Sequence, residues 1–141
     1  MRRFAYRFEP ALAEADLAFR SAARELAAAR AVAAGATAVV ESLVASGSTL
    51  QNVSPQTLWA LADLERWSAA QTARERRARA AANEALAAVR SRDVAYESAR
   101  RRRRGFQRQR ERLLAAFRRA EELCEDRDFA EANATRSNGG G

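Results

Sequence analysis

Residues 8–44 read FEPALAEADLAFRSAARELAAARAVAAGATAVVESLV, and apolar or small residues recur in them at alternating steps of three and four positions. The recurring positions are Phe8, Leu12, Ala15, Phe19, Ala22, Leu26, Ala29, Ala33, Ala36, Val40 and Leu43. This spacing places them on one side of a helix, as in the heptad seam of a coiled coil. The stretch therefore predicts one long helix with a single apolar seam.

A second seam with the same spacing follows later in the chain. It consists of Ala78, Ala82, Ala85, Val89, Tyr96, Ala99, Phe106, Leu113, Phe117, Ala120 and Cys124, and arginines interrupt it at Arg92, Arg103 and Arg110. The strongest turn signal of the chain lies between the two seams. Two long helices joined by one turn predict an all-α fold, an antiparallel coiled-coil hairpin whose second helix is longer and overhangs the first.

The ends of the helices are predicted from capping residues. Helix one should run from about 8 to 45 and stop in the Ser-Gly-Ser-Thr segment 46–49, because glycine is typical after the last helical turn. The turn is expected over about 46–54. Helix two should run from about 55 to 132, with Ser54 as N-cap and Pro55 in the first helical position. Residues 1–134 are then one hairpin domain, and residues 135–141 a disordered tail.

Gly105 follows five consecutive arginines and could end a helix. No N-cap or proline follows it, and the seam keeps its register from Ala99 through Arg103 to Phe106. We therefore expect a continuous helix in which the glycine lowers the local helix stability by about 1 kcal/mol relative to alanine.

Folding the chain about residue 50 would pair Leu43 with Leu58 and place Phe8 near Asp93. No residue of helix one would then lie opposite helix two beyond Arg100, and the rest of helix two would project as an overhang of about 45 Å. The overhang carries an apolar stripe, and an exposed stripe of this kind is typical of an interface. Its members are Phe106, Leu113, Leu114, Phe117 and Leu123.

Composition excludes several classes of site. The chain has no histidine, so neither a Ser-His-Asp arrangement nor an imidazole metal site can form. The single Cys124 occupies a seam position and is expected to be a small buried thiol. We expect no enzyme, cofactor, metal or small-molecule substrate, and a reduced cytosolic location. Glu9, Glu14 and Asp16 interrupt the apolar core that an export signal would need. The longest uncharged stretch, residues 42–62, is too polar to span a bilayer, so any membrane association should be peripheral.

The charge is strongly uneven. All 25 basic side chains are arginine, and the formal net charge is +7. Residues 100–119 contain ten arginines and a single acidic residue, Glu111, which gives that stretch a local charge of roughly +9. A mostly acidic segment follows it. Nucleic acid is the less favoured partner, because no stacking aromatics or base-reading amides are interleaved with the arginine run, residues 100–104. Anionic lipid or an acidic protein surface fits at least as well.

Two tryptophans mark a second candidate contact surface near the start of helix two. Trp59 and Trp67 are too badly spaced to share one narrow seam, so at least one should face outward or pack over the turn. Tryptophan is enriched at interface hot spots. Packing over the turn, against Leu50 and Val53, is expected more of Trp59 than of Trp67.

The opening Phe4-Ala5-Tyr6-Arg7-Phe8-Glu9-Pro10-Ala11-Leu12 resembles the aromatic-x-Tyr-Arg-Leu-Glu-Pro-x-Leu opening of FliJ-like flagellar export proteins. The Ser-Pro break beyond one third of the length, followed by the Asp63-Leu64-Glu65-Arg66 segment, is similar to the layout of that family. Phe8 replaces the family's usual leucine, and the arginine run replaces mixed lysine and glutamate. The resemblance covers nearly the whole chain.

The resemblance implies a two-helix stalk, similar to the gamma stalk of rotary ATP synthases. It would contact the hexameric export ATPase and the cytoplasmic domain of the export gate, and escort export chaperones, at the cytoplasmic face of the inner membrane. The expected ring interface is Arg103, Phe106, Arg110, Leu113 and Phe117. The expected gate interface is Leu61, Leu64 and Trp67.

Three alternatives stay open from the sequence. The related stalk proteins of virulence-type secretion systems share the hairpin. A basic coiled coil that binds nucleic acid would use the arginine run, residues 100–104. A homodimeric scaffold would cover two overhangs with each other.

Overall fold

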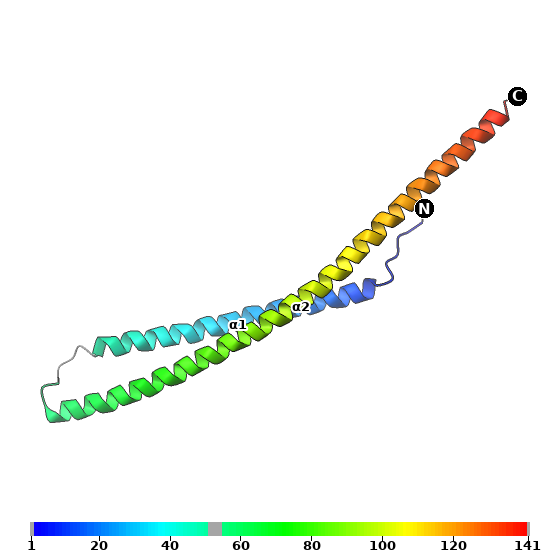
Figure 1. Ribbon diagram of the computed structural model, residues 1–141. Helices are drawn as coiled ribbons and strands as arrows, with labels where there is room; N and C mark the ends of the chain where they lie inside the picture. Colours follow the sequence, from blue (N-terminus) through cyan, green and yellow to red (C-terminus); the bar gives the residue numbers. More distant parts are fainter. Residues whose placement is uncertain (1, 51–54, 141) are drawn as a thin grey trace. The chain divides into compact units, whose positions relative to one another are not determined.

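The computed structural model describes residues 2–50 and 55–140, and these form two α-helices with no strand among them. Helix α1 spans Glu9–Leu50 and helix α2 spans Leu58–Asn138. They form an antiparallel coiled-coil hairpin in which α2 is the longer helix (Figure 1). The predicted fold class is therefore confirmed. The chain divides into two compact units, residues 19–98 and residues 1–18 with 99–141, and each is described by itself.

In the unit of residues 19–98, the two helices meet through the predicted small-residue seams. Leu26 and Ala33 of α1 are 4% and 5% exposed, and Ala82 and Ala85 of α2 are each 8% exposed. The rings of Phe19 and Tyr96 pack at 5.3 Å between centroids. Because alanine fills most inward positions, the interface is thin, and few large side chains hold it together.

Among the residues that the structure describes, one polar side chain is buried in this seam. Gln71 of α2 is 6% exposed, and its Nε2 donates a hydrogen bond of 2.7 Å to the carbonyl oxygen of Leu43. A buried amide is tolerated when its donor is paired, and it specifies which residues face each other. The bond ties the last turns of α1 to one position of α2.

Helix α1 ends at Leu50, so the predicted end near residue 45 is wrong. The hydroxyls of Ser46 and Thr49 donate to the carbonyls of Ser42 and Ala45, so they are satisfied within the helix. Gly47 is buried, and an added Cβ there would lie 3.0 Å from Oε1 of Glu75. The glycine serves close packing against α2, not the end of the helix.

Helix α2 begins at Leu58, so the predicted start at Pro55 is also wrong. The amide of Ala60 donates to Oγ1 of Thr57 at 3.0 Å, which makes Thr57 the N-cap. Ser54, the predicted N-cap, lies outside the described residues. The prediction rested on the Ser-Pro signal and did not consider Thr57, although threonine also caps helices.

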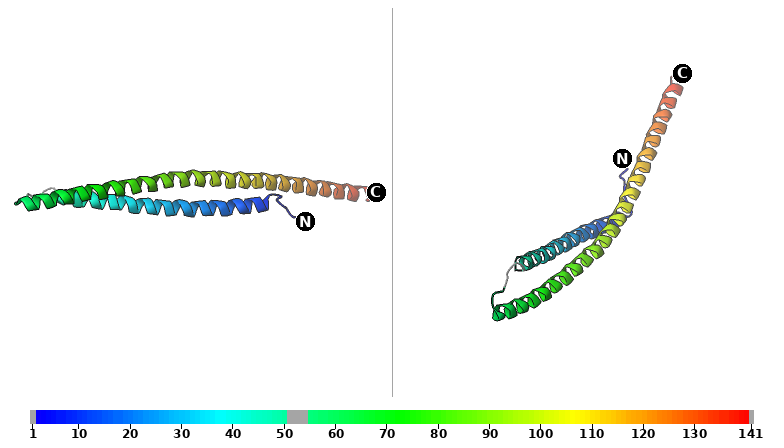
Figure 2. Two further views of the ribbon diagram at one scale, coloured as in Figure 1. Left: turned by 90° about the horizontal axis from the view of Figure 1, so that it is seen from below. Right: turned by 60° about the vertical axis from the view of Figure 1, so that its left-hand side comes forward.

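The register of the hairpin differs from the prediction. Leu43 faces Gln71 instead of Leu58, and Asp93 pairs with Arg30 at 3.9 Å instead of lying near Phe8. The cause is the longer α1 together with the later start of α2. The first turns of α2 consequently extend beyond the end of α1 in every view (Figures 1 and 2).

Helix α2 continues through Gly105 without a break, as expected from the register that the seam keeps across this glycine. Its C-terminal end lies at Asn138, so the predicted disorder is wrong for residues 135–138. Thr135 donates to the carbonyl of Glu131 at 3.1 Å, and the amide of Gly139 donates to the carbonyl of Thr135 at 3.0 Å. Arg136 in the last turn carries the charge sign that the helix dipole favours.

Helix α1 is also long and apolar enough, by length and composition alone, to cross a membrane. Its window of high hydropathy owes much to alanine. Within the same helix, Ala33 is buried, and Arg30 pairs with Asp93 of α2. These contacts give α1 a packing partner in the hairpin.

Gly35 and Gly105 are helical glycines with nothing within 4 Å of an added Cβ. We expect Gly35→Ala and Gly105→Ala each to raise the free energy of unfolding by about 1 kcal/mol, because alanine loses less backbone entropy in a helix. Urea unfolding followed by circular dichroism measures this. Gly47→Ala is the comparison, since the added methyl group would displace the carboxylate of Glu75 and should make the gain smaller. Equal gains at all three positions would contradict this packing.

Candidate interaction surfaces

The N-terminal strap, residues 2–8, precedes α1 and lies along α2 in the unit of residues 1–18 and 99–141 (Figure 1). Tyr6 is 7% exposed, and its hydroxyl donates to Oε1 of Gln109 at 2.8 Å. The same hydroxyl lies 3.3 Å from the carbonyl oxygen of Phe106. The strap is thus fixed to α2 by a buried ring with a satisfied polar end.

Aromatic contacts extend the strap along α2. The rings of Phe4 and Phe117 lie 5.6 Å apart in a tilted arrangement. Tyr6 and Phe8 meet edge to face at 5.9 Å, and the guanidinium of Arg102 lies 6.0 Å from the ring centroid of Phe106. These geometries are typical of favourable aromatic and cation–π contacts.

Each arginine that interrupts the second seam meets an acidic residue of α1. Arg103 Nε lies 2.9 Å from Oδ1 of Asp16, and Arg110 Nε lies 3.1 Å from Oε2 of Glu9. In the other unit, Arg92 NH1 lies 2.9 Å from Oε2 of Glu25. All three pairs keep some contact with solvent, so each contributes little stability, but together they favour one register over its neighbours.

The premise that α2 lacks an intrachain partner beyond Arg100 is therefore wrong. Of the expected ring-contacting residues, Arg103 and Arg110 pair with α1, and Phe117 packs on Phe4, while Phe106 lies against Tyr6 and Arg102. Leu113 is the exception and is 45% exposed. The strap was missed because an extended segment spans about 3.3 Å per residue, against about 1.5 Å in a helix, so a few residues cover several helical turns.

The uncovered end of α2 is residues 118–138. Every residue there is exposed except the half-buried Glu121, and Leu123 and Phe129 are 70% and 71% exposed. Figure 2 shows this end running past the strap. Cys124 is an exposed free thiol, so its predicted burial is wrong. The prediction assumed that another helix still covered the seam as far along α2 as Cys124.

The first turns of α2 form an apolar surface. Leu58 and Trp59 are 83% and 84% exposed, and Leu61 is 41% exposed. Leu64 and Trp67 follow at steps of three and are half-buried. Trp59 therefore faces solvent instead of packing over the turn. Of its two expected contacts, Val53 and the side chain of Leu50 lie outside what the structure describes. The three expected gate-contacting residues lie on neighbouring turns of α2.

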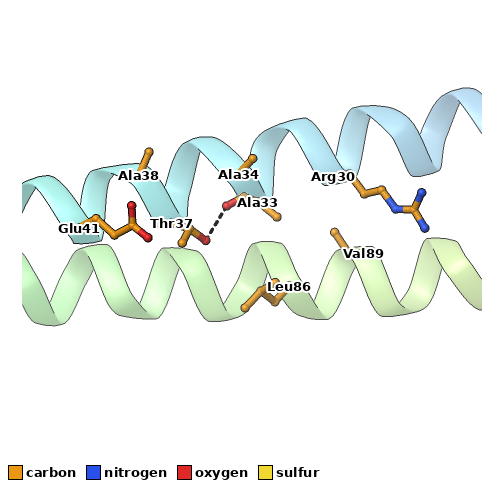
Figure 3. Close-up of a pocket in the computed structure, with 8 residues that line it drawn as sticks. All are labelled: Arg30, Ala33, Ala34, Thr37, Ala38, Glu41, Leu86 and Val89. Atoms are coloured by element: carbon orange, nitrogen blue, oxygen red, sulfur yellow. Dashed lines mark hydrogen bonds between the residues drawn. The ribbon is translucent and has the colours of Figure 1, made fainter.

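The hairpin carries shallow, open grooves between its helices. One groove of about 460 Å³ is lined mainly by small and aliphatic residues, three of them alanines, with Arg30 and Glu41 at its two ends (Figure 3). Thr37 on its floor donates to the carbonyl of Ala33 at 2.9 Å. No group of three or more metal-ligating side chains occurs in the described part of the chain. The groove has no pair of groups placed for acid–base chemistry.

Comparison of the chain with family models, with curated proteins and with solved structures found no match.

The two tyrosines give a matched test of the strap. Tyr6→Phe removes the hydroxyl that donates to Gln109 and should lower the free energy of unfolding by about 1 kcal/mol. Amide hydrogen exchange in residues 2–8 should become faster. Tyr96→Phe is the control. The contact of Tyr96 with Phe19 is made by its ring, so removing the hydroxyl should change the free energy of unfolding little. Equal effects of the two substitutions would contradict the role assigned to the Tyr6 hydroxyl.

Proposed function

We propose that this protein is a non-enzymatic coupling stalk of the bacterial flagellar type III export apparatus. One observation carries the proposal. The FliJ-like opening, residues 4–12, supplies the residues that hold the strap and the start of α1 on α2. Phe4 contacts Phe117, Tyr6 bonds Gln109, and Glu9 pairs with Arg110. A motif with a defined packing role is stronger support for the resemblance than a likeness in composition.

The surface offered to the hexameric export ATPase is smaller than the one expected from the sequence. Arg103, Phe106, Arg110 and Phe117 serve the packing of the strap and α1. Leu113 remains available, together with the uncovered end of α2. A ring subunit would contact these residues without displacing the strap.

The surface offered to the cytoplasmic domain of the export gate is formed by Leu61, Leu64 and Trp67. The exposed Leu58 and Trp59 enlarge it at the tip of α2. Export chaperones are the third class of partner, and the location is the cytoplasm, peripheral to the inner membrane. An equivalent stalk of a virulence-type system would have the same geometry.

Leu113→Asp tests the ring contact. We expect at least tenfold weaker binding to the export ATPase, because a carboxylate would replace an apolar contact at the interface. Pull-down followed by titration calorimetry measures the change. Val94→Asp is the control, since Val94 is 72% exposed and lies outside both surfaces. Unchanged ring binding by Leu113→Asp would count against this surface.

Leu61→Asp tests the gate contact in the same way. It should weaken binding to the cytoplasmic domain of the gate at least tenfold and leave ring binding unchanged, while Leu113→Asp should do the reverse. This double dissociation separates two surfaces from a general loss of folding. If either substitution weakened both contacts equally, the two surfaces would not be distinct. Sedimentation of the wild-type chain as a concentration-independent dimer would instead favour a scaffold.

A further inference from the structure

We propose that α2 carries a surface that binds the headgroup phosphates of an anionic lipid bilayer. The surface is the arginine stripe, defined as Arg101, Arg104, Arg108, Arg112 and Arg119. The proposal concerns lipid alone and does not rest on the export role.

The arginine stripe follows from helical geometry. Its members are separated by three or four residues, apart from one gap at Ala115, so at 3.6 residues per turn they share one side of α2. The opposite side holds Arg103, Phe106 and Arg110, which contact α1 and the strap. The stripe therefore faces away from the rest of its unit, and all five side chains are exposed.

The five arginines have no ion-pair partner among residues 2–50 and 55–140. Glu111 is the single acidic residue between positions 100 and 119. Glu111 follows Arg108 by three positions and lies on the same side of α2, so five arginines and one glutamate leave this side a net charge of about +4. Like charges in a row repel one another, and an anionic partner that extends along the row would relieve this repulsion.

The length and straightness of the stripe favour a flat partner. From Arg101 to Arg119 the helix rises about 27 Å, and a straight row of that length can meet a planar surface with all five guanidinium groups at once. Guanidinium groups bind phosphate oxygens in bidentate fashion. A lipid headgroup layer offers such phosphates in a plane.

Nucleic acid fits the same face less well. The phosphates of a duplex wind around its axis, so a straight row of arginines meets only a few of them. Three of the residues that could stack on or read bases are engaged elsewhere, since Gln109 bonds Tyr6, and Phe106 and Phe117 face the strap side. Stacking platforms and base-edge contacts are the usual means of recognising single strands and sequences.

The stripe also has a defined end. Glu122 and Asp126 continue the same side of α2 beyond Arg119 and are exposed. An anionic surface would repel them, so the contact should stop near Arg119. Removing these two acidic charges should therefore strengthen binding to an anionic surface, whereas removing the arginines should weaken it.

The experiment is co-sedimentation of the full chain with vesicles of phosphatidylcholine, with or without one third phosphatidylglycerol. A basic residue near an anionic bilayer contributes about a fivefold gain in partitioning, so R104Q/R108Q/R112Q should weaken binding to the anionic vesicles about a hundredfold. The control, R74Q/R76Q/R77Q, removes the same charge from exposed positions of α2 outside the stripe and should have less than about a fivefold effect. E122Q/D126N should bind several-fold more tightly than wild type.

Three outcomes would overturn the proposal. The first is equal loss in the stripe and control variants, which would indicate net charge alone. The second is unchanged vesicle binding by the stripe variant. The third is a wild-type chain that fails to bind anionic vesicles but binds a DNA duplex in a stripe-dependent way, which would assign the arginines to nucleic acid. Circular dichroism of each variant checks that the helix is intact.

Discussion

The hairpin depends on the register in which an alanine seam meets a second, arginine-interrupted seam. Alanines alone specify register weakly, because sliding by one heptad exchanges one small side chain for another. Glu9 and Asp16 are seven residues apart, as are Arg103 and Arg110 with which they pair. Gln71, hydrogen-bonded to the carbonyl of Leu43, adds a specific contact in the other unit. These exposed ion pairs add little stability in the observed register. In any other register at least some of the same charges would lie at the seam without a partner, which would destabilise that register.

The same register explains why the N-terminal strap exists as a packed element. Once Glu9 is held at Arg110, the residues before it follow α2 toward its C-terminal end. Tyr6 and Phe4 then meet the positions where the second seam still presents Phe106 and Phe117. The strap covers apolar surface that α1 is too short to reach. A segment without regular structure thus completes the coiled-coil interface.

The sequence predicts the fold class well, but it predicts poorly which residues of α1 and α2 lie opposite each other. The reason is physical. Heptad spacing reports which side of each helix is inward, and inward positions such as Leu26, Ala33, Ala82 and Ala85 are indeed buried. Spacing does not report which residue lies opposite, and the predicted pairing was displaced by thirteen positions at Leu43. The matched seven-residue intervals of acids and arginines were a usable signal. The strap was harder to foresee, because an extended segment has no periodicity that identifies its partner.

The two uncovered ends of α2 differ in chemistry, and this difference limits what each can bind. The first turns expose Leu58, Trp59 and Leu61, whose apolar area favours burial against a similarly apolar partner at about 25 cal/mol per Å². The last turns expose Leu123 and Phe129 among six acidic residues, so an apolar partner there must also carry basic groups. The arginine stripe, between Arg101 and Arg119, has the opposite charge and favours an anionic partner. The three surfaces thus differ in the chemistry that each would require of a partner.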